Sequence, residues 1–101
     1  MLSTYALNGL REYVKSTLAY AKYKIGSTYY QEKLTDVTVG SDGKVRVEFT
    51  INPTVKGEIK ITEVQLYNTA GQLWWSKTES ITRKTSQEGI YYRVTISITE
   101  E

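Results

Sequence analysis

Residues 44–51 read Lys-Val-Arg-Val-Glu-Phe-Thr-Ile, in which every second residue is apolar. A side-chain period of two is typical of a β-strand that buries one face and exposes the other. Turn-forming residues bound this strand on both sides, with Ser41-Asp42-Gly43 before it and Asn52-Pro53 after it. The stretch therefore predicts an antiparallel sheet as the main element of the fold.

Four further stretches carry strand patterns. We expect them at Leu34–Val39, at 58–67, from Leu73-Trp74-Trp75 towards Ile81, and at Ile90–Ile98. The strand at 58–67 changes its apolar phase near Thr62-Glu63, which indicates a β-bulge. Turns are expected at Asn68-Thr69-Ala70-Gly71 and at Ser86-Gln87-Glu88-Gly89.

The stretch 4–25, by contrast, predicts one amphipathic helix. Its apolar residues recur in steps of three and four, at Leu7, Leu10, Val14, Leu18, Ala21 and Ile25. Ser3 or Thr4 can cap its start, and Gly26 can end it in the left-handed conformation. Tyr13 and Tyr20 lie beside the stripe, and we expect them to widen the buried face, or to extend an interface if the sheet is too small to cover them.

These elements predict an α+β fold in a single domain over residues 1–101. In this arrangement the helix 4–25 packs on an antiparallel sheet of about five strands, formed by a β meander over 29–99. Neither an internal repeat nor a low-complexity linker divides the chain.

Many enzyme chemistries are excluded because the 101 residues include neither cysteine nor histidine. The chain therefore has no disulfide, no cysteine zinc site and no Ser-His-Asp triad. Its glycines form no phosphate-binding loop. The carboxylates considered as an acid–base pair are Glu48, Glu58, Glu63, Asp36 and Asp42, and we interpret them as solvated charges. The sequence predicts no catalytic residue, no cofactor and no metal site, and hence a protein that is not an enzyme.

Thirteen basic and eleven acidic residues leave a formal charge of +2, which argues against nucleic acid as a partner. Arg11, Lys15 and Lys22 form a basic face of the expected helix, and Glu12 lies among them. We interpret this face as solvated rather than as a phosphate contact. No signal-peptide pattern and no membrane-spanning apolar run is present, so we expect neither secretion by a signal peptide nor a membrane span.

Aromatic residues are the most unusual part of the composition, with nine Tyr, two Trp and one Phe. Adjacent aromatic pairs occur at Tyr29-Tyr30, Trp74-Trp75 and Tyr91-Tyr92, and in a strand each pair points one ring inward and one outward. The outward rings fit cross-strand packing, a protein interface, or a platform for carbohydrate or single-stranded nucleic acid. Our interface candidates are Trp74, Trp75, Tyr67 and Tyr91.

Residues 61–73, Ile-Thr-Glu-Val-Gln-Leu-Tyr-Asn-Thr-Ala-Gly-Gln-Leu, resemble a strand–turn–strand pattern of bacteriophage and prophage tail proteins of the tail-collar or tail-fibre type. The order of elements is also similar, with an N-terminal helix that opens near 7–10 and a terminal strand at 92–98. The chain departs from that pattern in being short and in lacking a repetitive fibre shaft. The resemblance implies a non-enzymatic part of a tail fibre, collar or baseplate that assembles with itself, as a homo-oligomer, or with other virion proteins. It also implies a location in the virion or, for a prophage-encoded protein, in the bacterial cytoplasm.

Overall fold

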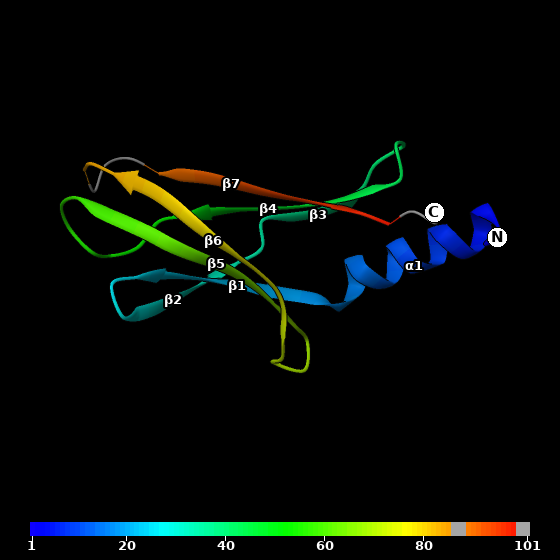
Figure 1. Cartoon of the computed structure of the whole chain (residues 1–101), viewed down its shortest axis with the longest axis horizontal. Helices are drawn as coiled ribbons and strands as arrows, with labels where there is room; N and C mark the ends of the chain where they lie inside the picture. The colour runs from blue at the N-terminus through cyan, green and yellow to red at the C-terminus, as the bar shows by residue number, and fades with distance from the viewer. Residues whose placement is uncertain (86–88, 99–101) are drawn as a thin grey trace.

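The computed structural model describes residues 1–85 and 89–98. The elements in these ranges are α1 (Thr4–Thr17), β1 (Leu18–Ile25), β2 (Thr28–Lys33), β3 (Asp36–Val39), β4 (Lys44–Ile51), β5 (Ile59–Asn68), β6 (Leu73–Arg83) and β7 (Ile90–Ser97). The strands form two antiparallel sheets. Sheet A has the order β2-β1-β5-β6, and sheet B has the order β3-β4-β7. Figure 1 shows the sheets as two layers, with α1 extending from one end of the molecule.

The core lies between the inner faces of the two sheets. Sheet B contributes the alternating apolar residues of β4, and these are fully buried at Val45, Val47, Phe49 and Ile51. Sheet A contributes buried residues of β1 and β5, which are Leu18, Ala21, Tyr23, Ile59, Ile61, Val64 and Leu66. The predicted α+β class is confirmed, but the single sheet of about five strands under a helix is wrong. Each sheet covers the other, so the core does not need the helix as its second layer.

The helix ends at Thr17, so the prediction of a helix over 4–25 is wrong for residues 18–25. Those residues also alternate, with Ala21 and Tyr23 buried on the inner face of β1 and Lys22 and Lys24 on its outer face. Pairing with β2 on one side and β5 on the other uses the hydrogen-bonding groups of β1. The apolar residues of 18–25 fit both a helical and a strand period, and pairing with two neighbours makes this segment a central strand.

The sequence predicts an N-cap at the start of the helix and a left-handed glycine, Gly26, at its end, and both of these local conformations are present. Ser3 is the N-cap, and its hydroxyl oxygen accepts a hydrogen bond from the backbone N–H of Ala6 at 3.1 Å. Gly26 does have a positive φ of 62°. It lies between β1 and β2, however, and so forms a hairpin turn rather than a helix end.

The predicted meander over 29–99 is also wrong, because β5 returns to pair with β1 and β7 pairs with β4. Two predicted turns are confirmed, at Ser41-Asp42-Gly43 between β3 and β4 and at 68–71 between β5 and β6. The bulge near Thr62-Glu63 is confirmed by register shifts of β5 against both of its neighbours. The turn predicted at 86–89 involves residues 86–88, which lie outside the described ranges.

Candidate interaction surfaces

The structure separates the four aromatic interface candidates. Trp75 pairs with the fully buried Leu66, so it points inward and packs against the core. Trp74 therefore points outward, and 36% of it is exposed. Tyr67, at the neighbouring end of β5, also lies on the outer face of sheet A, as the partner of Tyr20.

Tyr91 lies on the outer face of sheet B, on the opposite side of the molecule. Its hydroxyl donates a hydrogen bond to Glu48, which also accepts one from Arg93 at 3.0 Å. The bond from Tyr91 and the charge of Arg93 lower the pKa of Glu48, and the same bond raises the pKa of Tyr91. Glu48 is therefore held ionised, which does not suit a general acid.

Arg11, Lys15 and Lys22 do not share one face. Lys22 is in β1, where its ammonium lies 4.8 Å from the ring centroid of Tyr67. Lys15 is exposed in the last turn of α1. Arg11 is half-buried and turned towards the body of the protein, where its Nη2 donates to the main-chain oxygen of Ile98 at 2.8 Å.

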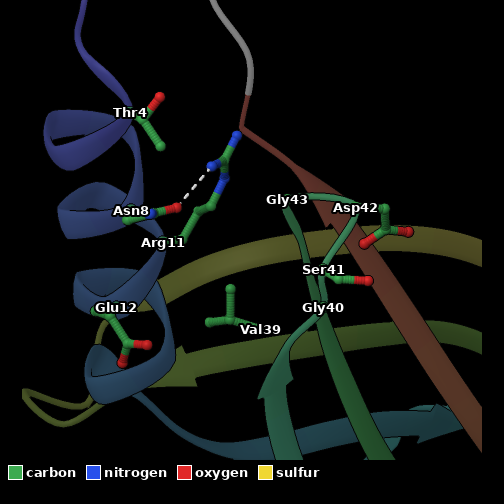
Figure 2. Close-up of a pocket in the computed structure, with 9 residues that line it drawn as sticks. All are labelled: Thr4, Asn8, Arg11, Glu12, Val39, Gly40, Ser41, Asp42 and Gly43. Carbon is green, nitrogen blue, oxygen red and sulfur yellow. Dashed lines mark hydrogen bonds between the residues drawn. The ribbon is translucent and has the colours of Figure 1, made fainter.

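A cleft of about 570 Å³ separates α1 from the turn after β3 (Figure 2). Residues of α1, including Asn8 and Arg11, form one wall, and residues 39–43 form the other. Figure 2 shows Arg11 reaching across the top of the cleft, with its Nη1 bonded to Asn8 Oδ1 at 3.0 Å. The Nε of Arg11 is buried without a hydrogen-bond partner. Much of α1 thus lies beside the β3–β4 hairpin without packing closely against it.

The apolar residues of α1 fall into two stripes. Leu7 and Val14 face the protein, and Val14 is the buried residue of the helix. A second row, which we call the α1 stripe, has spacings of four, three and four and consists of the apolar Ala6, Leu10 and Tyr13 followed by Thr17. Leu10 is 45% exposed and Tyr13 is 63% exposed. The middle of this row, Leu10 and Tyr13, is therefore exposed, whereas Ala6 and Thr17 at its ends are half-buried.

The outer face of sheet A carries an ordered array of aromatic and charged side chains. The rings of Tyr20 and Tyr67 are stacked, with centroids 5.2 Å apart and planes inclined by 4°. Lys22 lies over the ring of Tyr67 as well. Cross-strand contacts of this kind stabilise a sheet and fix the positions of the side chains.

A chain of hydrogen bonds continues from this stacked pair along β5. The Tyr67 hydroxyl donates to Gln65 Oε1 at 2.8 Å, and Gln65 Nε2 donates to Glu63 at 2.7 Å. The Tyr29 hydroxyl donates to the same carboxylate at 2.9 Å, which raises the pKa of Tyr29. Lys24 lies 5.6 Å from the centroid of the Tyr29 ring. The array thus spans three strands of sheet A.

Within residues 1–85 and 89–98, no group of three or more acidic side chains is placed to hold a metal ion. In the same ranges, no helix is long and apolar enough to span a membrane. Comparisons of the chain with protein-family models, with curated proteins and with solved structures find no significant match.

Proposed function

We propose that this chain is a non-enzymatic assembly protein that acts through protein–protein contacts, as a fibre, collar or baseplate component of a phage or prophage tail. The exposure of Leu10 and Tyr13 in the α1 stripe is the observation that carries the assembly role. The tail assignment draws on the resemblance of residues 61–73, which cover most of β5, the turn after it and the first residue of β6. Such a component works in a virion and, before assembly, in the bacterial cytoplasm.

A second copy of the same chain is the partner that fits the α1 stripe best. Spacings of four and three are those with which two helices interlock. Gly9 and Ser16 flank the stripe, and an added Cβ at Gly9 would meet nothing within 4 Å, so a second helix can approach closely. In the described part of the chain α1 is the only helix, so the matching helix in a self-assembly is another α1.

The size of the stripe predicts a weak contact. A tyrosine buries about 150–250 Å² when it is fully covered. Leu10 and Tyr13 are partly covered already, so their contribution is roughly 200 Å² per chain, against about 800 Å² per partner in a standard interface. We therefore expect self-association that depends on concentration, and stable assembly only when further surface is buried.

Engineered cysteines test the contact directly, because the chain has no cysteine of its own. Tyr13→Cys should form a disulfide-linked dimer under mild oxidation. Tyr5→Cys is the matched control. Tyr5 is 89% exposed but lies about 100° around the helix from Ala6, outside the α1 stripe. Equal cross-linking at both positions, or none at Tyr13→Cys, would contradict α1–α1 contact.

A further inference from the structure

The outer face of sheet A has a large surplus of positive charge. Its outward charged side chains, assigned from the pairing of the described strands, are Lys22, Lys24, Lys33, Lys60 and Glu63. Glu32 and Glu79 are turned to the inner side, where they accept hydrogen bonds from Tyr23 and Tyr92. Four lysines against one glutamate give this face three surplus positive charges, whereas the whole chain has a formal charge of +2.

The side chains on this face are already held in place. Gln65 is only 7% exposed, and its amide is bonded to both Glu63 and Tyr67. Lys22 and Lys24 rest over tyrosine rings. Binding to a pre-organised surface costs less side-chain entropy than binding to a mobile one. A ligand that binds this face would therefore meet side chains that are already fixed by contacts within the sheet.

The same contacts indicate which kind of ligand fits. Bases of single-stranded nucleic acid bind by stacking on open aromatic faces. The Tyr67 ring is stacked against Tyr20 and is also covered by Lys22, and the Tyr29 ring lies under Lys24. The array instead presents ammonium groups beside tyrosine rings on the broad surface of a sheet, and Trp74 is exposed on the neighbouring strand β6. Tyrosine and tryptophan are enriched in protein interfaces, where complementary charge selects the partner.

We propose that the outer face of sheet A docks an acidic polypeptide surface, with Lys22 and Lys24 beside partner carboxylates and the exposed Trp74 in apolar contact. The inference deepens the proposed function and rests on it for the protein nature of the ligand. It also supplies the additional buried area that the α1 stripe lacks.

A fluorescein-labelled polyglutamate peptide is the probe, and fluorescence anisotropy at several salt concentrations is the readout. We expect salt-dependent binding to the full chain. The double variant Lys22→Gln/Lys24→Gln should bind about tenfold more weakly or worse, because both central charges are lost. The matched control Lys44→Gln/Lys56→Gln removes the same charge from exposed lysines of the β4 start and the following loop, and should retain binding within about twofold.

Absence of peptide binding, or equal weakening in both double variants, would overturn the inference. An oligothymidine that binds through Lys22 and Lys24 while the peptide does not would overturn it in favour of nucleic acid, and an acidic polysaccharide that does so would reassign the face to a glycan. Cross-linking of Tyr13→Cys in the same preparations separates the two proposals. If cross-linking persists without peptide binding, only the docking inference fails, and if both are absent the proposed function fails as well.

Discussion

Arg11 Nη2, in the middle of α1, donates a hydrogen bond to the main-chain oxygen of Ile98 just beyond β7, 2.8 Å away. The same guanidinium covers Gly43 in the β3–β4 turn, where an added Cβ would lie 2.7 Å from Nη2. Arg11 therefore joins the helix to two parts of sheet B at once. Because the cleft separates α1 from the β3–β4 turn below this contact, we expect the hydrogen bond of Arg11 to be the main polar interaction that fixes the orientation of α1.

Arg11→Ala should lower the free energy of unfolding by about 1.5–3 kcal/mol, the range for hydrogen bonds that involve a charged group. Urea denaturation measures this change, and hydrogen exchange should show the largest loss of protection in α1. Lys15→Ala is the control on the exposed side of the helix and should change stability by about 0.5 kcal/mol or less. If the two substitutions lowered the free energy of unfolding equally, Arg11 would not fix the orientation of α1.

Gly43→Ala should destabilise the protein more than Gly57→Ala does. Both glycines have positive φ values, 80° and 84°, so each substitution carries the cost of about 1–2 kcal/mol for an L-residue in that conformation. An alanine at 57 meets nothing within 4 Å, whereas one at 43 must displace the Arg11 guanidinium from its bond to Ile98. Comparison of the two urea midpoints isolates this contact, and equal midpoints would contradict it.

Asp42 should titrate at unusually low pH. Arg46 donates to both carboxylate oxygens, at 3.2 and 2.5 Å, and the backbone N–H of Lys44 donates at 3.2 Å. These hydrogen bonds lower the pKa of Asp42 from 3.8 to about 2. Because the folded-state pKa is the lower one, the stabilising contribution is present above about pH 4 and is lost as the pH falls towards 2.

Carboxylate NMR titration measures this pKa, and Arg46→Gln should raise it towards the ordinary value. An Asp42 midpoint near 3.8 in the unsubstituted chain would contradict the ion pair.

Arg83 should be replaceable by methionine. Its side chain is fully buried at the end of β6, and Nη2 donates to the Val55 oxygen at 2.5 Å, but Nε and Nη1 have no hydrogen-bond partner. Arg83→Met removes a buried charge and two nitrogen atoms without hydrogen-bond partners, together with the bond to the Val55 oxygen, while filling much of the space. We expect the free energy of unfolding to be unchanged or raised by about 1–3 kcal/mol. Arg83→Ala leaves a cavity and should lower it by about 2–4 kcal/mol. Thermal unfolding distinguishes the two, and a methionine variant as unstable as the alanine variant would refute this interpretation.

The elements that the sequence predicts correctly have residue patterns that fit only one kind of local structure. Residues 44–51 alternate without interruption between two turns, and they form β4. The turn residues Asn68 and Gly71 likewise determine the β5–β6 hairpin, in which Asn68 Oδ1 accepts from the backbone N–H of Gln72 at 2.9 Å and Gly71 has a φ of 75°.

The errors arose where one pattern fits two structures. Residues 18–25 satisfy both a helical and a strand period, and the choice depends on pairing with β5, about 40 residues further along the chain. The basic face of sheet A was not predicted, because its lysines come from three strands and Lys22 was assigned to a helix. The split of the four aromatic candidates likewise depends on which sheet each strand joins.

Sedimentation equilibrium of the full chain, from about 5 to about 500 μM, tests the central claim most directly, since that range covers the weak association expected of so small an interface. We predict reversible self-association that Leu10→Ser/Tyr13→Ser abolishes and that Tyr5→Ser leaves unchanged. A chain that stays monomeric throughout, or that associates equally well with Leu10 and Tyr13 replaced, would contradict assembly through α1.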